Sequence, residues 1–191
     1  IDAQLTGALS DLPPLTYYLN LSNCPLVTGA LADLPPLTYY LNLSGCSLVT
    51  GALADLPPLT YRLDLSDCSL VTGALADLPP LTDRLSLYNC PLVTGALSDL
   101  PPLTDRLELD NCSLVTGVYT AVNGTDVPTT TILSNTGLSA ADMDATLIAY
   151  AACTKDNGTF TAAGKTRTAA SDAAVATLTG RGWTISGITT V

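Results

Sequence analysis

The chain has 191 residues, 47% of them hydrophobic, and a formal net charge of −10 from 17 acidic and 7 basic residues. No apolar run approaches the roughly 20 residues of a membrane span, and the few cations form no basic stripe, so we expect neither membrane insertion nor nucleic-acid binding. The chain contains no histidine, which excludes catalytic or metal sites built on imidazole. We expect no cofactor.

Residues 6–115 are five consecutive 22-residue blocks with almost the same sequence, and the block Thr28–Val49 reads TGALADLPPLTYYLNLSGCSLV. A fixed period of this length is typical of a solenoid, in which each block forms one coil and the stacked coils bury a continuous core. The threonines that open the blocks are Thr6, Thr28, Thr50, Thr72 and Thr94.

Every block contains the pattern Leu-x-Leu-x-x-Cys-x-Leu, which we expect to form the core of the coil. In the second block these residues are Leu41, Leu43, Cys46 and Leu48. Leucines two positions apart point to one side of an extended strand, and the cysteine takes the inward turn that follows. The five cysteines therefore predict a column of buried, reduced thiols. A sixth cysteine, Cys153, is expected to be buried near the C-terminus.

The other half of each block contains two adjacent prolines, which fix the backbone and forbid an α-helix. We expect this half to be extended or 3₁₀-helical. An aspartate precedes each Leu-Pro-Pro, where a short carboxylate favours a turn; a ladder of bound cations along these aspartates is a second interpretation. The aspartates are Asp11, Asp33, Asp55, Asp77 and Asp99.

This pattern resembles the leucine-rich repeat, whose consensus accepts asparagine or cysteine after the strand. The half LVTGALADLPPL is similar to the LTGxIPxxLxxL half of plant-type repeats. The resemblance covers about residues 5–138. It implies a mostly β solenoid with one parallel sheet on the concave face and a convex side that is not α-helical. It says little about function beyond the general use of solenoids in binding.

Residues 116–138 predict a degenerate sixth coil, which completes a solenoid over residues 1–138. In this coil Ile132-Leu133-Ser134-Asn135 replaces the strand pattern, and two extra residues fall near Asn123-Gly124. Residues 139–191 have a different texture and predict a small α/β capping unit.

The predicted cap contains two helices and two strands. Ser139 is a candidate N-cap for a helix through about residue 152, and Ser171-Asp172 begins a second helix that ends before Gly180. Short strands are expected at 158–161 and 183–185. The tail resembles the terminal unit of leucine-rich repeat proteins on bacterial, archaeal and phage surfaces, which implies an extracellular or cell- or virion-surface location. No comparable cap precedes the first coil, so head-to-tail self-association is an alternative there.

The blocks differ from one another mainly around the strand, while the stretch TGALADLPP changes only between alanine and serine. Two further variable columns are Tyr17, Tyr39, Tyr61, Asp83 and Asp105, and Asn23, Gly45, Asp67, Asn89 and Asn111. Because side chains alternate along a strand, three variable columns project outward together. These candidate ligand-binding residues are Tyr18, Asn20, Ser22, Tyr40, Asn42, Ser44, Arg62, Asp64, Ser66, Arg84, Ser86, Tyr88, Arg106, Glu108 and Asp110.

Tyrosine, arginine, serine and asparagine are the residue types that recognition surfaces use. The first hypothesis is therefore a non-enzymatic module that binds a protein or glycan on another surface, as an adhesin, a receptor ectodomain or a phage receptor-binding domain. Drift after recent duplication is the plainer explanation of the same variation. A second hypothesis is a structural subunit that stacks into an extracellular fibre or sheath. Ice binding through the threonine columns at Thr6–Thr116 and Thr16–Thr104 is a remote third. We expect no enzyme, because the acidic residues lie on an open sheet.

Overall fold

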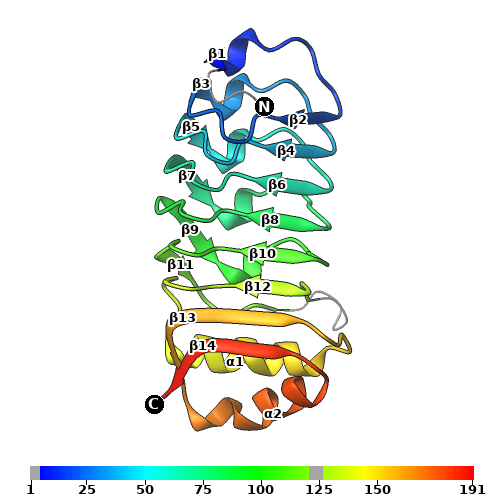
Figure 1. Ribbon diagram of the computed structural model, residues 1–191, viewed down its shortest axis with the longest axis vertical. Helices are drawn as coiled ribbons and strands as arrows, with labels where there is room; N and C mark the ends of the chain where they lie inside the picture. Colours follow the sequence, from blue (N-terminus) through cyan, green and yellow to red (C-terminus); the bar gives the residue numbers. More distant parts are fainter. Residues whose placement is uncertain (1–4, 121–126) are drawn as a thin grey trace.

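The computed structural model describes residues 5–120 and 127–191, and it shows a tall stack of parallel coils with two helices at the C-terminal end (Figure 1). One short strand from each coil enters an eight-stranded parallel sheet in the order β14-β13-β12-β10-β8-β6-β4-β2. The strands of this sheet are β2 (Tyr18–Asn20), β4 (Tyr40–Asn42), β6 (Arg62–Asp64), β8 (Arg84–Ser86), β10 (Arg106–Glu108), β12 (Thr130–Ile132), β13 (Thr159–Arg167) and β14 (Thr184–Thr190).

The register of the eight-stranded sheet follows the 22-residue repeat. Tyr40 lies beside Arg62, and Leu41 lies beside Leu63, so equivalent residues of neighbouring coils are in contact. Such alignment turns each sequence position into a column along the stack. The expected mostly β repeat architecture is confirmed, since parallel strands recur with the period of the sequence and helices are few.

The sequence led us to expect one parallel sheet, on the concave face; the described residues form a second, six-stranded parallel sheet from the Leu-Val-Thr-Gly-Ala segments. Its register is shorter: Thr28 lies beside Leu48, which is 20 positions on rather than 22. Each strand is therefore shifted by two residues, about 6.6 Å, relative to the repeat. The strands are β1 (Thr6–Ala8), β3 (Leu26–Ala30), β5 (Leu48–Ala52), β7 (Leu70–Ala74), β9 (Val93–Ala96) and β11 (Leu114–Thr116).

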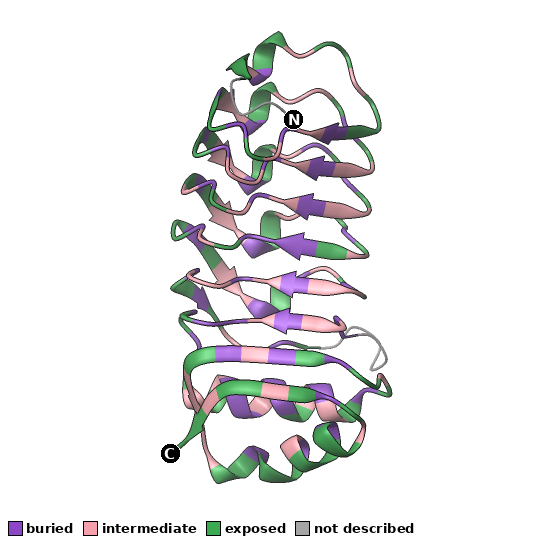
Figure 2. Cartoon of the chain, viewed as in Figure 1, coloured by how far each residue is buried: buried purple, intermediate pink, exposed green. Residues whose placement is uncertain are grey.

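The second sheet also corrects the expected core. Leu48 opens β5 and is 45% exposed, whereas the next residue, Val49, is fully buried. Alternation along the strand explains this difference, because only one of two successive side chains can face inward. The other three positions of the pattern are buried in every coil, as Figure 2 shows for the middle of each strand. The exposed leucines recur as Leu26, Leu48, Leu70, Leu92 and Leu114.

A 3₁₀ turn follows each of the first five strands of the six-stranded sheet, so the prediction of an extended or 3₁₀ conformation is confirmed. In the second coil the carboxylate of Asp33 accepts a hydrogen bond from the Ala30 amide, 3.0 Å away, and the other coils repeat this contact. The aspartates therefore cap turns. The turns are η1 (Leu9–Asp11), η2 (Leu31–Asp33), η3 (Leu53–Asp55), η4 (Leu75–Asp77) and η5 (Leu97–Asp99).

Two polar ladders tie neighbouring coils together. The hydroxyl of Thr60 donates to the carbonyl of Thr38 at 2.9 Å, and other coils do the same. Inside the stack the thiol of Cys68 donates to the carbonyl of Leu43 at 3.2 Å. All six cysteines are buried and the five of the repeats are free thiols, as expected, and burial raises the pKa of Cys68 to about 12.

The cap continues the eight-stranded sheet and closes one end of the core. Helices α1 (Ala140–Ala152) and α2 (Asp172–Gly180) agree with the predicted segments, and η7 (Ala169–Ser171) precedes α2. Strands β13 and β14 are longer than expected, because they pair with each other over Thr159–Thr161 and again, after a register shift, over Lys165–Arg167. Within the described residues, no helix has the length and apolar character of a membrane span. The two extra residues expected near Asn123-Gly124 lie outside the described part.

Candidate functional site

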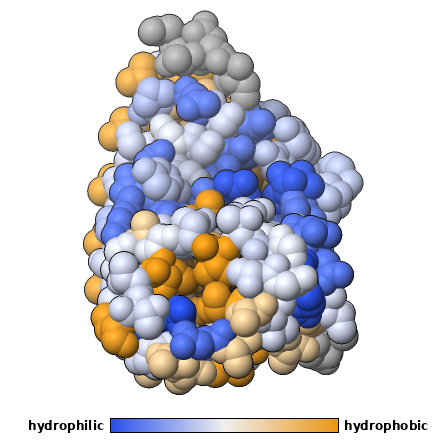
Figure 3. Space-filling model, turned by 60° about the horizontal axis from the view of Figure 1, so that its bottom comes forward, coloured by the Kyte–Doolittle hydropathy of each residue, from blue (hydrophilic) through white to orange (hydrophobic). Residues whose placement is uncertain are grey.

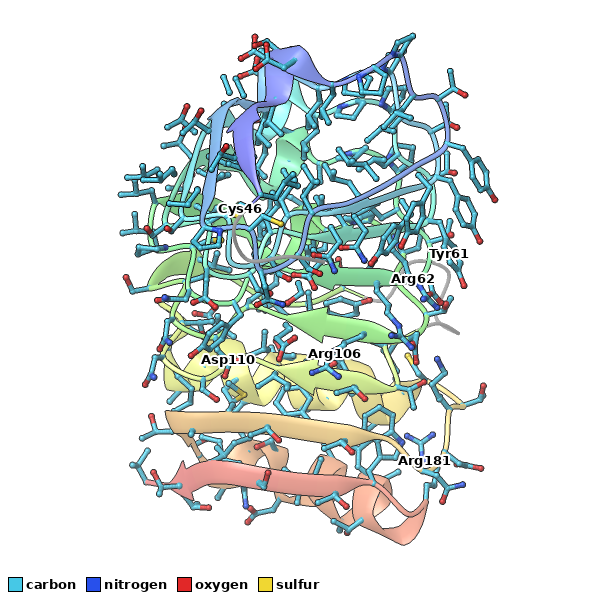
Figure 4. The ribbon with its side chains drawn as sticks, turned by 45° about the horizontal axis from the view of Figure 1, so that its top comes forward. Cys46, Tyr61, Arg62, Arg106, Asp110 and Arg181 are labelled. Atoms are coloured by element: carbon cyan, nitrogen blue, oxygen red, sulfur yellow. The ribbon has the colours of Figure 1, made fainter. Side chains whose placement is uncertain are left out.

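The outward surface of β2, β4, β6, β8 and β10, together with the residues that flank these strands, is here called the strand face. The structure brings together all the predicted ligand-binding residues there, in three adjacent columns. The central strand of the series shows the arrangement: Arg62 and Asp64 point outward, while Leu63 between them is 1% exposed. Figure 4 shows Arg62 and Arg106 on this face and Cys46 inside the stack.

Tyrosines of the first three coils stack on one another. The rings of Tyr17 and Tyr39 are 4.6 Å apart between centroids, and those of Tyr39 and Tyr61 are 4.5 Å apart. A second ladder contains Tyr18 and Tyr40, also at 4.6 Å. The facing sides of neighbouring rings are therefore covered, whereas the end rings Tyr17 and Tyr18 remain 59% and 51% exposed.

The asparagines of the first two coils fold back on their own backbone. Asn20 accepts a hydrogen bond from the Ser22 amide at 2.9 Å, and its amide group donates to the Tyr18 hydroxyl at 3.3 Å. Asn42 makes the same contacts, and Asp64 accepts from both the amide and the hydroxyl of Ser66. The side chains of Asn20, Asn42 and Asp64 in this middle column therefore stabilise the turn after each strand, which explains part of the residue choice without a ligand.

The arginines of the strand face pair with acids of the next coil. Arg62 donates through Nε to Asp83, and Arg84 donates in the same way to Asp105 at 2.5 Å. The next coil offers no acid at this position, and Arg106 instead holds both oxygens of Glu108 on its own strand, at 3.0 and 3.1 Å. Tyr61, the last ring of the tyrosine ladder, packs against Arg62. The central carbon of the Arg62 guanidinium lies 4.6 Å from the centre of the Tyr61 ring.

Sequence reasoning left Asp83 and Asp105 outside the candidate site. The sequence contained a signal for this pairing. Tyrosine gives way to arginine at Arg62, in the third coil, and in the adjacent column tyrosine gives way to aspartate at Asp83, one coil later. The column of Asn23, by contrast, varies for a structural reason. Its members adopt positive φ, 59° at Asn23 and 61° at Asp67, where asparagine, aspartate and glycine are favoured.

A shallow depression of about 340 Å³ lies in the middle of the strand face. The hydroxyl of Ser86, which is 7% exposed, contacts the Ser66 hydroxyl at 2.7 Å and the Glu108 carboxylate at 3.0 Å on its floor. The residues that line it are Tyr40, Asn42, Arg62, Leu63, Asp64, Arg84, Ser86, Arg106 and Glu108.

Within the described residues, the lysines and arginines that donate to no backbone carbonyl all lie on the strand face. The chain has seven lysines and arginines, and four of them lie in the cap. Each of these four donates to at least one backbone carbonyl: Lys155, Lys165, Arg167 and Arg181. An anionic ligand would therefore find its charge partners among Arg62, Arg84 and Arg106. Within the described residues, no group of three or more acids and cysteines is arranged to hold a metal ion.

Asp110 lies beside the depression, in the column that begins with Ser22. Figure 4 shows it along the same coil as Arg106. Its Oδ2 atom is buried and has no hydrogen-bond partner in the described part of the chain. Burial raises the pKa of this carboxyl above its ordinary value, and the nearby negative charge of Glu108 acts in the same direction. The folded state therefore holds a carboxylate that would be better solvated in the unfolded chain.

Replacing Asp110 with Asn should stabilise the protein at neutral pH. Because the folded-state pKa is raised, the charge destabilises the fold above that pKa, and the penalty disappears as the pH falls through it towards the unfolded value of about 3.9. We expect a gain of up to about 1 kcal/mol at pH 7 and none at pH 3. Urea unfolding of both proteins at the two pH values measures this. A gain of equal size at pH 3 would contradict the assignment.

The threonine columns considered for ice binding are occupied within the stack. Thr38, Thr60, Thr82 and Thr104 use their hydroxyls on the preceding coil. In the six-stranded sheet the shifted register places Leu48, not Thr50, beside Thr28. Neighbouring threonines of this second column are therefore offset by two residues along the strands.

Comparison of the chain with protein-family models, with curated proteins and with solved structures gives no match.

Proposed function

We propose that this chain is a non-enzymatic recognition module of the leucine-rich repeat type, and that its strand face binds a protein or glycan on another surface. The observation that carries the proposal is the distribution of differences between coils. Buried positions and the 3₁₀ turns barely change, whereas the outward column changes from Tyr18 and Tyr40 to Arg62, Arg84 and Arg106. Drift would scatter differences over all exposed positions, including the exposed leucines and threonines of the six-stranded sheet, and these are invariant.

The leucine-rich repeat assignment rests on the repeat pattern and on the register of 22 residues between β4 and β6. Location on a cell or virion surface, as part of an adhesin or a phage receptor-binding protein, belongs to the same proposal. The stacked tyrosines and paired arginines support binding by the strand face, because a rigid, pre-ordered surface loses little conformational entropy when it binds.

Simultaneous replacement of Tyr18, Tyr40, Arg62, Arg84 and Arg106 by alanine tests the proposal. We expect it to abolish binding to intact cells or to glycan arrays, with the far-ultraviolet circular dichroism spectrum retained. The matched control replaces five side chains with the same spacing on the six-stranded sheet and should leave binding unchanged. The control residues are Leu26, Leu48, Leu70, Leu92 and Leu114. Binding that survives the first set of replacements would exclude the strand face as the site.

A second candidate function, stacking into a fibre or sheath, is favoured by the two ends of the coil stack. Figure 3 shows apolar surface at the C-terminal end, where Val175, Ile185 and Ile188 are only partly buried. At the other end a depression of about 150 Å³ is lined partly by Leu5 and Leu9. Contacts between unlike ends do not close on themselves and would produce fibres. Sedimentation velocity discriminates: a chain that stays monomeric at high concentration is not such a subunit.

A further inference from the structure

We infer that the depression around Arg84 binds the carboxylate of an acidic sugar, such as a uronic or sialic acid residue of a glycan. This inference rests on the proposed function and specifies its ligand. Arg84 is the central cation of the strand face, with Arg62 and Arg106 on the strands to either side. Its side chain is 47% exposed, the largest exposure among the arginines of the face.

All three arginines line the depression. Arg84 donates through Nε to Asp105, and the same atom lies 3.7 Å from Asp83; within the described residues neither of its terminal nitrogens has a partner. Arg62 and Arg106 each use Nε and Nη2, and their Nη1 atoms have no partner among the described residues. Two terminal nitrogens of one guanidinium match the two oxygens of a carboxylate, so Arg84 can bind it in a bidentate manner.

Charge favours a single carboxylate over a polyanion. The three arginines face four carboxylates, those of Asp64, Asp83, Asp105 and Glu108, and the whole chain carries a net charge of −10. A sulfated or phosphorylated polymer would be repelled at long range by this excess of negative charge. A monoanion that enters the depression meets the free nitrogens at short range, where local pairing outweighs the distant field.

The lining favours a sugar over a peptide. Only one of the nine lining residues, Leu63, is aliphatic, so the depression has no apolar pocket for the hydrophobic anchor that dominates most protein contacts. It offers acceptors for hydroxyl groups instead. Asp64 uses Oδ1 for Ser66 and keeps Oδ2 free within the described structure, and Glu108 faces the same space. The volume of about 340 Å³ lies at the lower end of the range for small-molecule sites.

The test is a titration of the ¹⁵N-labelled chain, followed by arginine Nε–Hε and backbone resonances. The probes are glucuronic acid and N-acetylneuraminic acid, with glucose and the methyl ester of glucuronic acid as neutral counterparts, and N-acetylglutamic acid N-methylamide as a peptide-like carboxylate. We expect both sugar acids to saturate the Arg84 signal with a dissociation constant on the order of 1 mM, and the other probes to bind at least about tenfold more weakly.

Two variants sharpen the test. Arg84→Gln should weaken both sugar acids at least about tenfold, because it removes the bidentate charged donor. Asp105→Asn should strengthen them, because it releases Arg84 from its acidic partner. Asp77→Asn is the matched control for Asp105→Asn. It makes the same change in net charge on a 3₁₀ turn outside the depression, and it should leave the affinity for both sugar acids unchanged. Circular dichroism confirms the fold of each variant.

The outcomes separate this inference from the proposed function. Absence of saturable binding by either sugar acid, or equal binding by the peptide-like carboxylate, overturns the inference even if the strand face proves to bind cells. Tighter binding by Asp105→Asn together with loss in Arg84→Gln supports it. If cell or glycan binding survives the five alanine replacements of the strand face, the proposed function fails instead.

Discussion

Replacement of Gly73 by alanine should lower the free energy of unfolding by about 3 to 5 kcal/mol. Gly73 lies in β7 at φ +113°, a conformation that side chains rarely tolerate. A Cβ atom there would also stand 2.7 Å from the Leu53 backbone nitrogen and 3.2 Å from the Leu53 Cβ. Both atoms belong to the 3₁₀ turn of the preceding coil, so the strain cannot be relieved by rotating a side chain.

Urea unfolding followed by circular dichroism measures the loss. Because coils contact mainly their neighbours, the loss of stability is measured at the first transition if unfolding separates into stages. Gly7→Ala is the matched control, since Gly7 has φ +134° but its nearest atom lies 3.9 Å away. It should lose only about 1 to 2 kcal/mol, from backbone strain alone. Equal losses in the two variants would show that the close approach between coils is unimportant.

The repeat pattern predicted the strands that the regular coils contribute to the eight-stranded sheet, because one rule applied in every coil; it did not predict that β13 and β14 of the cap extend that sheet. Alternation of Leu41 and Leu43 around an outward residue fixes which side is buried, and the 22-residue period fixes the register. The six-stranded sheet was missed because its strands contain Gly and only one buried side chain, such as Val49, so they show no clear alternation. They are held in place by stacking of the coils, a tertiary effect that local propensity does not report.

The candidate site was predictable in its position and less so in its contacts. Sequence alternation placed Arg62 and Arg84 on one face with the tyrosines. It could not show that the Nε groups of Arg62 and Arg84 pair with Asp83 and Asp105 in the adjacent column. That pairing depends on the conformations that the long arginine side chains adopt between coils. Nor could it distinguish Asn23, which is required by positive φ, from residues that vary without a backbone reason.

Replacement of Asp144 by alanine should cost about 3 kcal/mol, the second large effect. Asp144 lies on α1 and is 6% exposed. Its carboxylate accepts the Thr168 hydroxyl and the Ser171 hydroxyl, each at 2.6 Å, and the Thr168 amide at 3.0 Å. These bonds join α1 to the turn η7 that leads into α2, and alanine would remove the acceptor of the Thr168 amide and hydroxyl and the shorter of the two acceptors of the buried Ser171 hydroxyl.

The pH dependence of this effect identifies its cause. Burial by itself would raise the pKa of Asp144, but the hydrogen bonds from Ser171 and Thr168 outweigh burial and lower it. A lowered folded-state pKa means that the stabilisation is complete above the unfolded value of about 3.9 and is lost as the pH falls through the folded value. The difference in the free energy of unfolding between wild type and Asp144→Ala should therefore shrink below about pH 4.

Asp172→Ala, which removes an exposed carboxylate paired with Arg167, is the control and should cost less than about 1 kcal/mol. A deficit in Asp144→Ala that is the same at pH 3 and pH 7 would mean that lost packing, and not the charged hydrogen bonds, holds the cap together.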